Sequence, residues 1–156
     1  MTNDQFKQIA SHWLTGVAVV TSKAADGELC GMTMSAVTSL SLDPPQFLVC
    51  MDQRAKTLSA IESSGAFCIH YLSAEQRHLS THFSRPGGDR FTDVPYRVGS
   101  TGSPILDGTI AYVECKLAKV HHGGDHSIVI GEAVHGEVSG GQPLAYFHGA
   151  YRRIAD

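Results

Sequence analysis

Hydroxyl side chains concentrate in residues 31–45, a stretch that otherwise holds apolar and turn-forming residues. They belong to Thr33, Ser35, Thr38, Ser39 and Ser41. Hydroxyls both donate and accept hydrogen bonds, so a group of them at a strand end can surround the polar edge of a flat heterocycle. The stretch therefore predicts a binding site for a heterocyclic ligand.

A basic segment, Asp-Gln-Arg-Ala-Lys-Thr at residues 52–57, leads into a predicted helix over residues 56–64. Free amides at a helix N-terminus and the positive charges of Arg54 and Lys56 would both attract a phosphate. A solvated basic turn has the same composition. The segment alone leaves both interpretations open.

Nine histidines raise the question of a metal site. His78 and His82 lie four residues apart on one predicted helix face, but the glutamate of an HExxH motif is missing. His121, His122 and His126 surround a predicted turn, where residues 121 and 122 point to opposite faces of a strand. Neither set predicts a metal site.

The sequence contains none of the motifs GxGxxG, GxxxxGK[ST] or GxSxG. A Rossmann dinucleotide fold, a P-loop and the simplest hydrolase are therefore not supported.

Length and composition limit the class of protein. The 156 residues predict a single domain over 1–156, and 42% hydrophobic residues suffice for one core. A net charge of −3 argues against nucleic-acid binding. Charged residues reach only 17%, against about 25% in typical chains, which suggests that a second subunit covers part of the surface.

Targeting signals are not recognisable. The longest apolar run, residues 47–51, is far shorter than the roughly 20 residues that cross a bilayer. The four cysteines are far apart, as expected of reduced thiols. We expect a cytoplasmic protein without a membrane partner.

Periodicity predicts many short strands and few helices. Helices are expected at 3–14, 56–64 and 73–83, and a long irregular loop at 84–108. Strands are expected at 17–21, 28–37, 46–51, 66–72, 109–121 and 126–137, with a last segment at 144–154. This pattern is typical of an antiparallel barrel with helices at its edges.

Pieces of a known pattern occur in order along the chain. They are TGVAVVT at 15–21, the run 31–45, FLVC at 47–50, SGAF at 64–67, QRHLS at 76–80, RF at 90–91, GDH at 124–126, GE at 131–132 and PLAY at 143–146. With them the chain resembles the flavin reductase family of FMN-binding split-barrel proteins, the reductase components of two-component flavin monooxygenases. The implied fold is mainly β with flanking helices, an antiparallel Greek-key split β-barrel.

The resemblance also implies roles for individual residues. The flavin ring would face Thr33, Met34, Ser35 and Ala36. The ribityl chain and phosphate would lie near Thr38, Ser39, Lys56 and Thr57. The pocket would be lined by Cys50, Met51 and Asp52, and closed by Phe83, Ser84 and Arg85. His126, the one residue with an expected catalytic role, would orient the nicotinamide, and Tyr151 would border that space.

The implied activity is hydride transfer from NADH, with NADPH as the second candidate, to FMN or FAD. A homodimer would then release reduced flavin to a separate oxygenase. Two alternatives remain open: a reductase of the same fold whose tightly bound flavin serves a corrin cobalt or ferric complex, and a non-catalytic flavin-binding protein. His70 replaces a usual Asn, and Arg54-Ala55-Lys56-Thr57 replaces a usual Ser-x-Thr.

Overall fold

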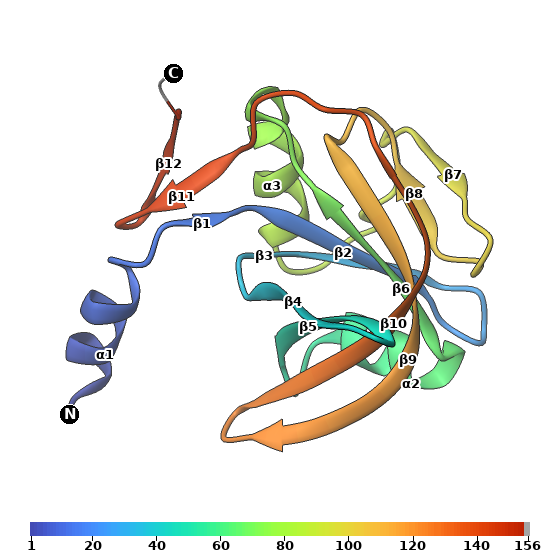
Figure 1. The fold of residues 1–156 in the computed structure, drawn as a ribbon, viewed down its shortest axis with the longest axis horizontal. Helices are drawn as coiled ribbons and strands as arrows, with labels where there is room; N and C mark the ends of the chain where they lie inside the picture. The colour runs from blue at the N-terminus through green and yellow to red at the C-terminus, as the bar shows by residue number, and fades with distance from the viewer. Residues whose placement is uncertain (155–156) are drawn as a thin grey trace.

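A curved antiparallel sheet of seven strands dominates the computed structural model, which describes residues 1–154 (Figure 1). Its strand order is β3-β2-β6-β9-β10-β5-β4. In chain order these strands are β2 (Ala18–Lys23), β3 (Leu29–Met34), β4 (Val37–Leu42), β5 (Pro45–Asp52), β6 (Ala66–Tyr71), β9 (Ala111–Gly123) and β10 (His126–Val138). Within residues 1–154, no helix has the length and apolar character needed to span a membrane.

The smaller elements stand around this sheet. The helices are α1 (Asn3–Ala10), α2 (Lys56–Ser64) and α3 (Arg77–Ser84), with a 3₁₀ turn η1 (Ala74–Gln76) before α3. A hairpin forms from β7 (Tyr96–Val98) and β8 (Pro104–Leu106). A separate three-stranded sheet holds β1 (Thr15–Gly16), β11 (Ala145–Phe147) and β12 (Ala150–Arg152).

β3 and β4 follow each other along the chain but lie at opposite edges of the sheet. Residues 35–36 alone connect them, so the sheet must curl until its edges approach. The two edge strands do not pair with each other. The result is an open, split barrel, and the predicted fold class is confirmed.

Local signals in the sequence account for most element boundaries. Helix α2 ends at Gly65, whose φ of 73° belongs to the left-handed region that favours glycine. The capping box predicted at Ser73 and Gln76 is present and begins η1.

Several predicted elements differ from those observed. The strand predicted over 28–37 ends at Met34, because the chain crosses to the other edge at 35–36. Helix α1 stops at Ala10 rather than residue 14. The predicted irregular loop 84–108 contains the β7–β8 hairpin.

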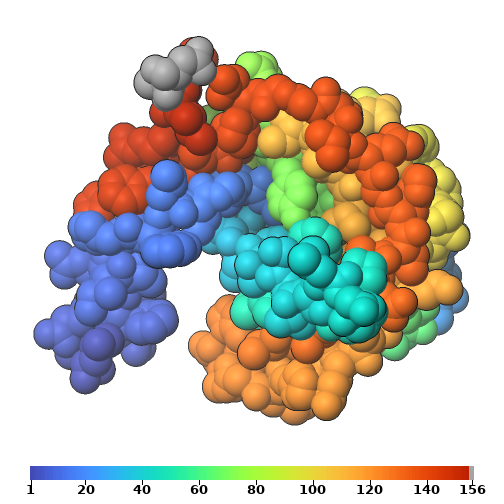
Figure 2. Space-filling model, viewed as in Figure 1, coloured from blue at the N-terminus to red at the C-terminus, as the bar shows by residue number. Residues whose placement is uncertain are grey.

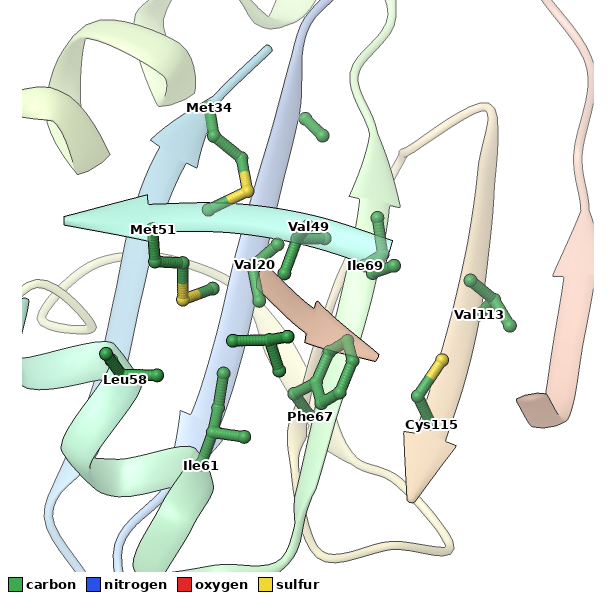
Figure 3. Close-up of a cluster of buried hydrophobic side chains, with 12 residues drawn as sticks. Val20, Met34, Val49, Met51, Leu58, Ile61, Phe67, Ile69, Val113 and Cys115 are labelled. Atoms are coloured by element: carbon green, nitrogen blue, oxygen red, sulfur yellow. The ribbon is translucent and has the colours of Figure 1, made fainter. Parts of the chain in front are cut away.

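The main core lies inside the curl, between the sheet and α2 (Figure 3). Its fully buried side chains include Val20, Val49, Met51, Ile61 and Phe67. A second cluster, which includes Val19, Leu72, Phe83, Phe91 and Leu106, packs beneath α3. These two clusters fix α2 and α3 against the β2–β3 edge of the sheet.

His70 is a fully buried polar residue of β6. Its Nε2 accepts a hydrogen bond from the backbone N–H of Leu106 at 3.1 Å. Its Nδ1 therefore carries the proton and donates to the carbonyl of Val19 at 2.9 Å. Burial is the largest of the effects that together lower the pKa of His70 to about 4. The histidine is a neutral structural link between β2, β6 and β8.

We predict that His70 makes the protein sensitive to acid. The unfolded chain binds a proton at this residue near pH 6.5 and the folded chain only near pH 4, so stability falls as the pH drops through this window. Between these pH values the wild type should lose about 3 kcal/mol more unfolding free energy than His70→Gln. Urea unfolding at a series of pH values measures the difference. Parallel pH profiles for the two proteins would contradict this role.

Candidate functional site

A groove of about 440 Å³ lies between β3, the N-terminus of α2 and the C-terminal end of α3. We call it the α2 groove. It brings together residues that are far apart in the sequence, and five of the predicted site residues line it: Thr33, Lys56, Thr57, Phe83 and Ser84. Its remaining walls come from residues 28–32, 54–55, 86–88 and Arg90.

The N-terminus of α2 forms one end of this groove. Ala55 occupies the N-cap position and has no side chain that could cap the helix amides. The amides at a helix N-terminus carry partial positive charge and attract anions. Lys56 adds a full charge beside them, held 3.5 Å from the carboxylate of Glu28. This end of the groove is suited to a phosphate.

Arg54 adds a second cation at the same end. Its guanidinium donates two hydrogen bonds to the carboxylate of Asp52, at 3.1 and 2.9 Å. These hydrogen bonds from Arg54 hold the pKa of Asp52 well below its usual range. The carboxylate is therefore ionised at neutral pH and fixes the position of the guanidinium.

Arg90 fastens the opposite wall. Its Nη1 donates to the carbonyl of Gly31 at 2.5 Å and to that of Phe83 at 3.1 Å, joining β3 to the end of α3. A Cβ on Gly31 would lie 2.8 Å from the Phe83 ring, so only glycine permits this close packing. Arg90 and Gly31 were not among the predicted site residues, although both fall within pieces of the family pattern.

A second groove, of about 660 Å³, separates the N-terminal arm (residues 10–18) from β4 and β5. Figure 2 shows this hollow between the N-terminal segment and the body of the molecule. We call it the arm groove. Four predicted residues line it, namely Ser35, Ala36, Thr38 and Cys50. Because Thr33 lines the α2 groove and Ser35 the arm groove, the β3–β4 link stands between the two.

Other predicted residues lie outside both grooves. The side chains of Met34 and Met51 point into the core, so only their backbones are available to a ligand (Figure 3). Ser39 is exposed on β4. Arg85 lines a depression on the outer side of α3. Tyr151 hydrogen-bonds the hydroxyl of Ser80 at 2.8 Å.

His126 begins β10 at the tip of the β9–β10 hairpin, directly opposite Asp52 in the register of β5. Its Nδ1 lies 2.7 Å from the carboxylate of Asp125, and this hydrogen bond lowers the pKa of Asp125. Gln53 ties the hairpin to β5 by donating to the carbonyls of Gly124 and His126. The imidazole is half-exposed and held next to the segment that leads into α2.

The two histidines of α3 that were considered as metal ligands lie close to backbone carbonyls. His78 Nδ1 lies 3.2 Å from the Glu75 carbonyl, and His82 Nε2 lies 2.9 Å from the Arg90 carbonyl. Over residues 1–154 there is no group of three His, Cys, Asp or Glu side chains arranged to hold a metal.

Comparisons with known proteins find relatives that are named as flavin reductases. The model of the flavin reductase like domain matches residues 10–155. A probable flavin reductase of Rhizobium meliloti is 41% identical over 88% of this chain, which spans only 44% of that protein. The FMN reductase (NADH) SmoA of Agrobacterium fabrum is 36% identical, covering 96% of this chain and 85% of that protein.

A solved structure agrees with the sequence relatives. Nitrilotriacetate monooxygenase component B from Mycobacterium thermoresistibile superimposes with a TM-score of 0.93 at 33% identity. The match covers 97% of this chain and 86% of that one. The order of the sequence pieces, the split barrel and these relatives agree, and the chain belongs to the flavin reductase like family.

Proposed function

We propose that this chain is a single-domain flavin reductase that transfers hydride from NADH to FMN or FAD and supplies reduced flavin to a partner oxygenase. The observation that carries the proposal is the α2 groove, where β3 faces a helix N-terminus flanked by cations. Relatives named as an NADH-dependent FMN reductase and a monooxygenase component support both the activity and the partner.

The residues of the α2 groove fit a flavin phosphate. The α2 amides and Lys56 provide charge and donors, and Thr57 adds a hydroxyl in the first turn. Lys56 is exposed, so its ammonium can turn from Glu28 to an arriving phosphate.

The edge of β3 fits the flavin ring. The Gly31 carbonyl points away from β2 towards Arg90, and Thr33, two residues further, directs its backbone groups to the same side. The Thr33 hydroxyl donates to the Ser80 carbonyl at 2.7 Å, which fixes this strand edge. A bound flavin supplies the hydride-accepting chemistry, and the chain holds the two ring systems at reacting distance.

Purified protein should oxidise NADH only when flavin is added. The rate of NADH oxidation is measured from NADH absorbance with FMN, with FAD and without flavin. This rate should saturate as the flavin concentration rises. If the protein binds flavin but does not oxidise NADH, it is the non-catalytic flavin-binding protein instead. A flavin that dissociates more slowly than turnover would favour the reductase with another acceptor.

We assign His126 to the nicotinamide side of the site, because Asp125 and Gln53 hold its segment beside Asp52. His126→Ala should raise the KM for NADH by about 2- to 10-fold, the range of one hydrogen bond, and leave the flavin Kd unchanged. His121→Ala on the paired strand is the control and should alter neither constant. Loss of flavin binding with an unchanged KM would refute this assignment.

We also propose that the chain forms a homodimer and acts in the cytoplasm, where its four free cysteines stay reduced. Helix α1 buries no residue, and Trp13 and Leu42 are 78% and 94% exposed. Trp13 lines the arm groove, and Leu42 ends β4. Large apolar side chains so exposed are typical of an interface.

Sedimentation should therefore give the mass of two chains for the wild type. Trp13→Ser with Leu42→Ser should shift the distribution towards one chain, because the apolar area that drives association is lost. Thr38→Ala, on β4 and in the lining of the arm groove, serves as the control. A wild type that sediments as one chain at micromolar concentration would contradict the homodimer.

A further inference from the structure

The α2 groove does not end at the helix N-terminus. It continues into a depression of about 560 Å³, which we call the Tyr96 groove. Four residues line both: Glu28, Leu29, Lys56 and Gly88. A ligand whose phosphate lies at Lys56 therefore has a continuous path beyond it.

An aromatic side chain stands at the far end of this path. Tyr96 is 39% exposed, and its ring packs edge-to-face on Phe91 with centroids 5.4 Å apart. Phe91 packs in the same way on Phe83 of the α2 groove, also at 5.4 Å. Because Phe83 and Phe91 are buried, the Tyr96 ring rests on a fixed support and can stack against a planar base.

The polar groups along the path suit a nucleotide. Lys56 stands at the junction of the two grooves, where a second phosphate would pass. When Lys56 turns to phosphate, the carboxylate of Glu28 is released from it and can accept from a ribose hydroxyl. Asp89 accepts hydrogen bonds from the Phe91 amide and the Thr92 hydroxyl, which hold its carboxylate in the wall of the groove.

We propose that the Tyr96 groove binds the adenylate half of FAD, so that this chain prefers the dinucleotide flavin to FMN. The proposal rests on the proposed function, since it takes the flavin phosphate to lie at the N-terminus of α2. The pyrophosphate extends past Lys56, and the adenine stacks on Tyr96. FMN reaches Lys56 but not Tyr96.

The test measures flavin Kd values directly, by quenching of flavin fluorescence without NADH. The wild type should bind FAD more tightly than FMN. Tyr96→Ser should weaken FAD binding about 10-fold, within the range expected for loss of one base–aromatic stack, and leave FMN binding unchanged. Tyr96→Phe, which keeps the ring, is the matched control and should behave as the wild type.

Lys56→Met separates this proposal from the function on which it rests. It should weaken the binding of FMN as well as that of FAD, because both place a phosphate at α2. Equal effects of Tyr96→Ser on FAD and FMN, or no effect on either, overturn the adenylate site. The adenylate site is also overturned if Tyr96→Ser raises the KM for NADH and leaves FAD binding unchanged. The Tyr96 groove would then bind NADH instead. A wild type that binds neither flavin refutes the proposed function itself.

Discussion

Two residues, Ser35 and Ala36, join strands that lie at opposite edges of a seven-stranded sheet. Three Cα–Cα steps from Met34 to Val37 span at most about 11 Å. A flat sheet of seven strands would hold its edges about 29 Å apart. The short link therefore forces the curl, and the curl encloses the core and places both grooves beside the link. The position of the site is a consequence of this connection.

Polar anchors hold the curled sheet and its attached hairpin. His70 fixes β8, and Glu114 of β9 accepts from the amide and hydroxyl of Thr101, both at 2.8 Å. Burial raises the pKa of Glu114, but its hydrogen bonds outweigh this and leave the pKa lowered. A Cβ on Gly99 would lie 2.3 Å from a Glu114 oxygen, so glycine is required there. Both anchors fix the β7–β8 hairpin that carries Tyr96.

The helix ends and caps that depend on a few neighbouring residues were predicted correctly from the sequence. The Gly65 stop and the Ser73 capping box depend on a few neighbouring residues, and both are present. Met51 shows what such local patterns leave out. Neighbouring residues of a strand face opposite sides of the sheet, so the side chains of Cys50 and Met51 cannot both face one ligand. Cys50 lines the arm groove, whereas the Met51 side chain lies in the core. The β7–β8 hairpin is anchored by His70 and Glu114, and Arg90 is linked to Gly31. The anchor from His70 and the link to Gly31 join residues more than 30 positions apart, which no local pattern reveals.

The cations of the α2 groove already have carboxylate partners at the surface, and this bears on how a flavin would bind. Arg54 and Lys56 pair with Asp52 and Glu28 at the surface, where solvent screens the attraction between the charges. When a phosphate arrives, each cation can leave its carboxylate for the phosphate, which also accepts hydrogen bonds from the α2 amides. A buried cation without its phosphate would cost several kcal/mol and would oppose release. Exposed cations that already have carboxylate partners need no phosphate for stability, as suits the proposed exchange of oxidised for reduced flavin.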